Sequence, residues 1–354
     1  MNTEYYNGAK LLSLKDLEGN TPELYLCTTN RTGGKTTYFS RLLVNAFLKK
    51  GEKFGLIYRF KNDMDNVADQ FFKDINTLFF PEYFMRSQIR ANKLYYELFI
   101  GRKGKDEETG GKPCGYAFAL NDADKIKRYS HLFSDIERMF FDEFQSETNR
   151  YCSNEVEKFQ SVHVSIARGQ SKQWRYVPVY MCSNPVTILN PYYVKMGISD
   201  RLKDDTLYLK GNGFVLEQGF VKSAAKAQLE SGVSKAFANS EYTAYSAQGV
   251  YLNDKKAFLE QIEGRSHYIC TLRYNGKDFA IREYAEKGIL YCDTRPDKTF
   301  ATKISVTTDD HNINYVMLKR NEFMIQTLRY IFDHGAFRFK NLECKQAVMK
   351  ALAY

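Results

Sequence analysis

Residues 28–37 of this chain, Thr-Thr-Asn-Arg-Thr-Gly-Gly-Lys-Thr-Thr, hold the side chains best suited to chemistry. The Gly-Lys-Thr within them is typical of the end of a phosphate-binding loop. In such a loop, backbone N–H groups wrap a triphosphate, the lysine reaches the β- and γ-phosphates, and the hydroxyl binds Mg²⁺. The motif calls for a glycine five residues before Gly34, where Thr29 stands. The sequence therefore raises the question whether this loop binds ATP or only resembles one that does.

The segments on either side favour ATP binding. Residues 24–27 are a short apolar run of strand type, and the apolar residues after the loop have helical spacing up to Gly51. A glycine-rich turn that precedes a lysine by coincidence would rarely have both neighbours. Strand, loop and helix together place a helix N-terminus under the phosphates. The residues predicted to contact nucleotide are Thr29, Asn30, Arg31, Thr32, Gly33, Gly34, Lys35, Thr36 and Thr37.

An apolar run that ends in Asp142-Glu143 supplies the companion motif about 100 residues later. At the tip of a core strand, the aspartate would hold Mg²⁺ beside the hydroxyl of Thr36, and the glutamate would polarise the attacking water. Alone this motif is weak, because charges often end strands. Together with Lys35 as the phosphate clamp, it predicts a catalytic set with Thr36 and Asp142 as metal ligands and Glu143 as the base.

Two further positions leave alternatives open. Arg168 lies in the last turn of a helix predicted for residues 154–168, where it could complement the helix dipole or act as an arginine finger on a neighbouring subunit. Ser183-Asn184 follows a strand predicted for residues 174–182. This pair could sense the γ-phosphate, or Asn184-Pro185 could simply start a turn. Spacing alone does not choose in either case.

Composition excludes several classes of protein. Of the 354 residues, 44% are hydrophobic, which is enough for packed cores, and 26% are charged, which is too few for a disordered chain. No apolar run approaches the roughly 20 residues of a membrane helix, and the first residues do not form a signal peptide. The seven cysteines are scattered without metal-ligand spacing, so we expect reduced thiols. The net charge of +9 mildly favours a polyanionic partner.

The order of elements predicts an α/β protein with a second unit at its C-terminal end. Strands and helices alternate over the first 200 residues, with a solvated hairpin tip at 101–112. Short strands and an Ala- and Ser-rich helix follow as a linker subdomain. Three strands at 267–274, 278–284 and 288–293 and a helix at about 313–332 then fit a ribonuclease-H-like unit. Its first strand lacks the carboxylate that a two-metal nuclease needs, so we expect no nuclease activity. The remaining candidate aspartates look scattered: Asp293, Asp309, Asp310 and Asp333.

With these motifs in order, the chain resembles the DNA encapsidation ATPases of small podophages related to phi-29. The resemblance covers nearly the whole length and rests on the order and spacing of several short segments. They are residues 30–36, 58–61, 141–144, 154–156, 183–186, 190–193, 291–294 and 307–312. The departure from the family pattern is Thr29, which leaves the backbone path of the loop open.

The resemblance implies a P-loop ATPase domain of the additional-strand, conserved-glutamate (ASCE) type with a mostly parallel sheet at residues 1–203. It further implies a linker at 204–248 and a vestigial nuclease domain at 249–354. It places the family's finger arginine at Arg168 and a basic, nucleotide-reaching motif at Arg59 and Lys61. A homopentameric ring at the portal of an empty prohead is also implied, in the host cytoplasm and absent from the mature virion. A packaging RNA is a further candidate partner.

The sequence therefore predicts an ATP-driven translocase that packages double-stranded viral DNA, uses Mg²⁺ and has no membrane partner. Three alternatives remain at this point. The first is a terminase large subunit with an active nuclease. The second is a P-loop-like DNA-binding or scaffold protein that does not hydrolyse ATP. The third is a bacterial helicase-like ATPase, for which the chain shows no helicase-specific motif.

Overall fold

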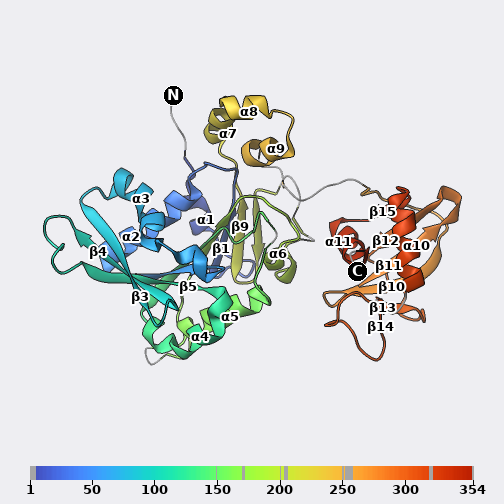
Figure 1. Cartoon of the computed structure of the whole chain (residues 1–354), viewed down its shortest axis with the longest axis horizontal. Coiled ribbons are helices and arrows are strands. Elements are labelled where there is room, and N and C mark those ends of the chain that lie inside the picture. Colours follow the sequence, from blue (N-terminus) through green and yellow to red (C-terminus); the bar gives the residue numbers. More distant parts are fainter. Residues whose placement is uncertain are drawn as a thin grey trace. The chain divides into compact units, whose positions relative to one another are not determined.

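The chain divides between residues 253 and 254 into two units, each with its own β-sheet (Figure 1). In this computed structural model, the described residues are 5–148, 150–169, 172–199, 201–202, 206–248, 251, 258–318 and 322–352. The two units are considered one at a time below.

The first unit is built on a nine-stranded sheet in the order β3-β4-β5-β2-β6-β7-β1-β9-β8. Six neighbouring strands run parallel: β5 (Lys112–Ala119), β2 (Lys53–Tyr58), β6 (Ile136–Asp142), β7 (Val179–Ser183), β1 (Leu24–Thr28) and β9 (Phe214–Gln218). Antiparallel strands extend both edges: β3 (Tyr83–Arg90), β4 (Tyr95–Arg102) and β8 (Tyr208–Gly211). The mostly parallel sheet confirms the predicted fold class. Strand β7 separates β1 from β6, as the additional strand of this class does.

Helices cover both faces of this sheet, because its central strands are apolar on both sides. Side chains alternate between two hydrophobic cores: Leu26 of β1 belongs to one, and its neighbours Tyr25 and Cys27 belong to the other. The core of Tyr25 includes residues of α1 (Ala9–Ser13), α2 (Lys35–Lys50) and α3 (Val67–Phe79). The core of Leu26 includes residues of α4 (Ala123–Arg128), α5 (Glu155–Ala167) and α6 (Pro191–Lys195). Three short 3₁₀ helices complete the unit: η1 (Lys61–Met64), η2 (Leu120–Asp122) and η3 (Ser130–Phe133).

The segment expected to form a separate linker is divided in the structure. Strands β8 and β9 pair within the large sheet, and β9 lies directly against β1. The remainder forms three short helices, α7 (Lys222–Leu229), α8 (Gly232–Ala236) and α9 (Glu241–Gln248), where one helix was expected at 223–240. Strands β8 and β9 follow the expected boundary at residue 203 but belong to the sheet of the first unit, because β9 pairs with β1.

The second unit has a six-stranded sheet in the order β14-β13-β10-β11-β12-β15. Strands β10 (His267–Tyr274), β11 (Lys277–Tyr284) and β12 (Ile289–Asp293) form the predicted antiparallel meander. Short strands β13 (Lys303–Ser305), β14 (Val316–Met317) and β15 (Phe337–Phe339) add parallel neighbours. Helices α10 (Glu322–Asp333) and α11 (Leu342–Leu352) contribute to its core, and η4 (Ala285–Lys287) precedes β12. The interpretation of this unit as ribonuclease-H-like stays a prediction.

Two predicted elements are shorter than expected. The helix expected from about residue 313 begins at Glu322, because residues 316–317 pair with β13 instead. The strand expected at 174–182 begins at Val179, where pairing with β1 and β6 starts. Among the described helices, none is long and apolar enough to cross a bilayer.

Candidate functional site

The phosphate loop occupies residues 29–34, between the end of β1 and the first residue of the 16-residue helix α2. The first four N–H groups of a helix have no partner within the helix, so those of Lys35, Thr36 and Thr37 are available to an anion. Gly34 has φ 89°, a left-handed conformation that requires glycine. A Cβ at Gly33 would lie 3.0 Å from the Val221 side chain, so a larger residue at this position would require Val221 to shift.

Thr29 is accommodated by the loop without strain at the position where the motif has glycine. It is 1% exposed and lies outside the set of residues with positive φ, so its backbone does not need glycine. Its hydroxyl donates to the Asn30 carbonyl at 3.0 Å. Its methyl group lies against Gly219, where an added Cβ would be 3.0 Å from Thr29 Cγ2. The threonine therefore fills space that a glycine on the adjacent segment leaves open.

Asn30 fastens the loop to the segment that follows β9. Its side chain is fully buried, accepts from the Val221 N–H at 2.9 Å and donates to the Val221 carbonyl at 3.2 Å. Such a paired contact replaces two backbone hydrogen bonds. Asn30 therefore holds the backbone of the loop, and its amide is directed at protein.

Lys35 and Asn184, the residues predicted as phosphate clamp and candidate phosphate sensor, lie in contact beside the loop, and their roles stay predictions. Lys35 Nζ donates to Asn184 Oδ1 at 2.7 Å. Asn184 stands at the end of β7, and the carbonyl of Ser183 beside it accepts from the Thr29 N–H at 3.3 Å. The Ser183 hydroxyl donates to the Asn184 carbonyl at 2.9 Å, so the serine shapes this turn.

Glu147 joins this cluster, although nothing in the sequence singles it out. Its Oε1 accepts from Arg31 at 2.5 Å, from Tyr245 at 2.6 Å and from Asn184 Nδ2 at 3.3 Å. Burial acts to raise the pKa of Glu147, but the Tyr245 hydrogen bond and the Arg31 charge outweigh it, and the pKa is lowered. Helix α9 also contacts the loop through Tyr242, whose hydroxyl accepts from Arg31 at 2.6 Å.

Thr36 and Asp142 also meet as predicted, from α2 and from the tip of β6. Thr36 Oγ1 donates to Asp142 Oδ2 at 2.8 Å, while Asp142 Oδ1 accepts from the Glu143 N–H at 3.0 Å. Burial raises the pKa of Asp142 against the hydrogen bond from Thr36 and the charge of Lys35. A hydroxyl beside an anionic carboxylate is a donor set that suits Mg²⁺, which takes few protein ligands and completes its shell with phosphate and water. These two residues would hold the ion, which would neutralise phosphate charge.

Glu143 occupies a strained turn at the end of β6. Its φ is 54°, in the left-handed region that costs a non-glycine residue about 1–2 kcal/mol. Partial burial and the charges of Asp142 and Glu147 raise its pKa, although Arg31 and Lys35 oppose this. A raised pKa is characteristic of a general base, because it brings the group closer to the working pH.

A cavity of about 350 Å³ opens beside these carboxylates. Asp142, Glu143 and Thr36 line the cavity. It is also lined by Tyr58 at the end of β2, Asp63 of η1 and Gln70 of α3. Burial raises the pKa of Tyr58, with the charges of Asp142 and Asp63 adding to the effect, so its hydroxyl is a hydrogen-bond donor throughout the physiological range. Glu143 therefore lines a space large enough for water.

Arg59 and Lys61 were predicted to reach nucleotide, but both are engaged elsewhere. Arg59 forms an ion pair with Glu155 at 2.8 Å, and its side chain is 10% exposed. Lys61 Nζ donates to the Asn92 carbonyl at 3.3 Å. Neither contact involves the phosphate loop, so a nucleotide-binding role for these two residues stays a prediction.

Arg168 ends α5 with an extended backbone, at φ −89° and ψ 144°. Its side chain is exposed, and within the described part of the chain no carboxylate pairs with it. The helix-dipole interpretation needs a side chain near the last carbonyls; the finger interpretation needs one that is exposed and unpaired. The observed exposure agrees with the second, which stays a prediction in a single chain.

Two of the four aspartates singled out in the second unit, Asp293 and Asp310, have structural partners. Asp293 pairs with Arg282 at 2.9 Å. Both carboxylate oxygens of Asp310 accept from the N–H groups of Asn275 and Gly276, which form the hairpin turn between β10 and β11. Over the described residues, no group of three His, Cys, Asp or Glu side chains could hold a metal ion.

The loop and the strand order together define the class of the first unit: it has the P-loop NTPase fold with the additional strand between the loop strand and the Asp-Glu strand. The chain belongs to the family of podovirus DNA encapsidation proteins (Gp16), whose family model matches residues 1–353. This membership confirms the resemblance on which the predicted fold and function depend.

Individual relatives agree with this assignment. The chain is 24% identical over 355 residues to the DNA packaging protein of Bacillus phage phi29, covering 99% of this chain and 96% of the relative. It is 23% identical over 313 residues to that of Bacillus phage B103, covering 87% of this chain and 89% of the relative.

Two solved structures share the fold over almost the full length. The bacteriophage Phi-29 viral genome packaging motor assembly gives a TM-score of 0.68 at 21% identity, covering 99% of this chain and 98% of the matched chain. The Phi-28 gp11 DNA packaging motor gives 0.59 at 14% identity, covering 100% and 99%. The arrangement of strands and helices is therefore that of phage packaging motors.

Proposed function

We propose that this protein is an ATPase that drives double-stranded DNA into an empty prohead. The observation that carries the proposal is the juxtaposition, in a DNA encapsidation family member, of Lys35–Asn184 at the loop and Thr36–Asp142 beside Glu143. The phosphate clamp and Thr36 come from the N-terminus of α2, Asp142 and Glu143 come from the end of β6, and Asn184 follows β7, so these groups meet where β1, β6 and β7 end. This is the arrangement that phosphoryl transfer to water requires.

In the proposed reaction, the loop N–H groups and Lys35 bind the β- and γ-phosphates of ATP. Thr36 and Asp142 would hold Mg²⁺, which would neutralise part of the phosphate charge that the attacking water must approach. Glu143 orients that water and accepts its proton. Asn184 exchanges its Lys35 contact for the γ-phosphate, so its side chain can report whether ATP or ADP is bound.

Arg168 completes the site of a neighbouring subunit in this proposal. Its side chain is exposed at the C-terminal end of α5 and pairs with no carboxylate of the described residues, which suits a group that stabilises transition-state charge in trans. Such sharing requires a head-to-tail interface between identical subunits, which forms a ring when it closes, and the pentamer implied by the resemblance is our proposal for the size of that ring.

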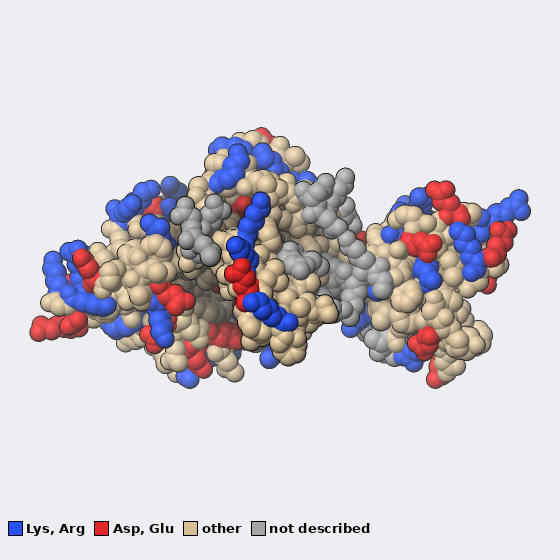
Figure 2. Space-filling view, turned by 90° about the horizontal axis from the view of Figure 1, so that it is seen from above, with Lys and Arg blue, Asp and Glu red and all other residues tan. Residues whose placement is uncertain are grey.

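Double-stranded DNA, the portal of the prohead and a packaging RNA are the proposed partners, met in the host cytoplasm. A translocating motor must hold any sequence, so phosphate contacts suit it better than base contacts. Figure 2 shows Lys and Arg side chains spread among Asp and Glu over the face drawn, without a single basic stripe. The +9 net charge therefore supports a moderate, sequence-independent attraction.

We propose that the ribonuclease-H-like unit, placed at residues 249–354 by sequence, is not a nuclease. Strand β10 carries no carboxylate, and Asp293 and Asp310 are engaged by Arg282 and by the hairpin turn. We likewise propose that α7–α9 act as the linker element, with α9 contacting Arg31 of the phosphate loop through Tyr242 and Glu147 through Tyr245.

A subunit-mixing experiment tests this proposal. Arg168→Ala subunits and Glu143→Ala subunits should each be inactive alone, because each lacks one part of the shared site. Mixed, they should regain part of the ATPase activity, since some interfaces then pair an intact Glu143 with an intact Arg168. Absence of rescue at every mixing ratio would count against action in trans.

A further inference from the structure

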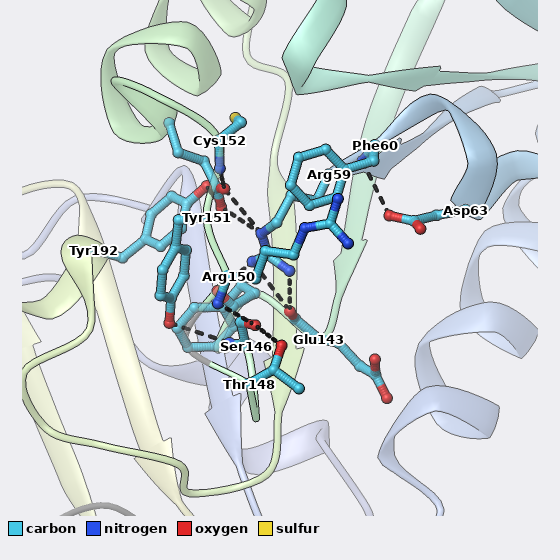
Figure 3. Close-up of polar contacts among 12 residues, drawn as sticks. Arg59, Phe60, Asp63, Glu143, Ser146, Thr148, Arg150, Tyr151, Cys152 and Tyr192 are labelled. Carbon is cyan, nitrogen blue, oxygen red and sulfur yellow. Dashed lines mark hydrogen bonds and ion pairs between the residues drawn. The ribbon is translucent and has the colours of Figure 1, made fainter.

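A buried ion pair contacts the turn that carries Glu143, and Figure 3 shows Arg59 of this pair next to that turn. Arg59 follows β2, and Glu155 begins α5; their side chains are 10% and 1% exposed. Arg59 Nε lies 2.8 Å from Glu155 Oε2 and 3.1 Å from Oε1. Charges so deeply buried persist where additional hydrogen bonds satisfy them.

The remaining donors of Arg59 are directed at the backbone of the catalytic turn. Both terminal nitrogens donate to the Glu143 carbonyl at 3.3 Å, and one donates to the Phe144 carbonyl at 2.9 Å. Figure 3 shows the Glu143 side chain extending away from the guanidinium. The arginine therefore contacts the main chain of the catalytic turn and leaves the carboxylate to the cavity.

The surroundings hold the guanidinium in one place. It stacks over the rings of Tyr151 at 4.9 Å and Phe141 at 5.6 Å. Glu155 is fixed in turn by the Tyr192 hydroxyl at 3.1 Å and the Cys152 N–H at 3.0 Å. A planar guanidinium held by aromatic rings and a carboxylate is rigid, whereas a lysine side chain at the same position would be flexible.

We propose that Arg59 is the positioning residue that holds Glu143 in its catalytic conformation. Glu143 adopts a left-handed backbone that a glutamate does not favour, and such strain persists only where the surroundings impose it. The direction of the Glu143 and Phe144 carbonyls defines that turn, and Arg59 donates hydrogen bonds to both of them. The proposal rests on the ATPase function proposed above and assigns Arg59 a role that does not require contact with ATP.

The decisive variant is Arg59→Lys. A lysine retains the charge opposite Glu155, but its single ammonium group cannot bridge the carboxylate and two carbonyls at once. We expect the protein to fold and to bind an ATP analogue with a Kd within about threefold of wild type. We expect kcat to fall at least about tenfold, because displacing a catalytic group by about 1 Å can cost up to 100-fold.

A second variant guards against a folding defect. Arg59→Gln combined with Glu155→Gln removes both buried charges, so neither is left unpaired. It should show the same loss of kcat with retained analogue binding. Arg138→Gln is the matched control. Arg138 lies near the start of β6, the strand whose other end leads into the Glu143 turn. It pairs with Glu52 and Tyr180 and does not contact that turn. It should lower the thermal midpoint while leaving kcat near the wild-type value.

The outcomes separate this inference from the proposed function. A wild-type protein without ATPase activity would contradict the proposed function itself. A wild-type protein that hydrolyses ATP, with an Arg59→Lys variant of normal kcat, would overturn the positioning role alone. Loss of analogue binding in Arg59→Lys would also overturn it and would return Arg59 to the nucleotide-binding role predicted from sequence.

Discussion

Replacing Thr29 by glycine tests whether the phosphate loop is intact despite its departure from the motif. The glycine variant restores the motif, so a loop damaged by the threonine should improve. The structure predicts the opposite, because Thr29 is 1% exposed and its backbone has no positive φ to relieve.

The magnitude follows from the contacts that are lost. The hydroxyl bond to the Asn30 carbonyl is worth about 1 kcal/mol, and each buried carbon about 0.8 kcal/mol. A glycine also adds about 0.4–1 kcal/mol of unfolded-state entropy. We expect the free energy of unfolding to fall by about 3 kcal/mol for Thr29→Gly and by about 1 kcal/mol for Thr29→Ser, which keeps the hydroxyl. The Kd for an ATP analogue should change less than about threefold in both variants, because backbone groups bind the phosphates.

The contact with Gly219 provides an internal control. A Cβ at Gly219 would lie 3.0 Å from Thr29 Cγ2, so Gly219→Ala should destabilise the wild type. In the Thr29→Gly background the space is free, and the same substitution should be neutral or stabilising. The coupling in this double-mutant cycle should reach about 0.5–3 kcal/mol, the range for residues in contact.

Urea unfolding monitored by tryptophan fluorescence measures these changes. Trp174 is the single tryptophan of the chain and lies in the first unit, so its signal reports on the unit that holds the loop. A Thr29→Gly variant that is as stable as wild type and binds nucleotide at least tenfold more tightly would refute the reasoning. It would mean that the threonine holds the loop away from its working form.

Three further predictions concern the carboxylates. Asp142→Asn should raise the free energy of unfolding of the nucleotide-free protein at neutral pH by about 0.5–2 kcal/mol in urea unfolding. The reason is that an acid whose pKa is raised on folding destabilises the folded state when it is ionised. A loss of stability would contradict this prediction. Since the pKa of Glu143 is raised, kcat should fall on acidification while the pH is still above the ordinary glutamate value of about 4.3, and Glu147→Gln should shift that fall to lower pH in a pH–rate profile. Plasmid incubated with the protein and Mn²⁺ should stay supercoiled on a gel, whereas nicking would favour the active-nuclease alternative.

Much of the fold and site could be predicted because their signals are local. The loop, its helix and the Asp142-Glu143 pair depend on residue types at fixed spacing along one element each. The parallel sheet then brings the ends of β1, β6 and β7 to one edge, so Thr36, Asp142 and Asn184 had to converge.

What escaped prediction depends on contacts distant in sequence. Glu147 acquires its role from Arg31, which is 116 residues away, and Arg59 acquires its role from Glu155, which is 96 residues away. The segment at 313–318 has apolar residues that suit a helix or a strand, and only pairing with β13 decides between them. Edge strand β3 was likewise missed, since it is stabilised by its antiparallel partner β4.

The central claim is that Glu143 activates water for ATP hydrolysis in a DNA motor. Steady-state ATPase activity with and without double-stranded DNA, for wild type and Glu143→Gln, tests it most directly. We predict hydrolysis by the wild type that DNA stimulates, and a loss of at least about 100-fold in Glu143→Gln with ATP binding intact. Hydrolysis at the wild-type rate in Glu143→Gln, or none in a wild type that binds ATP and DNA, would contradict the account.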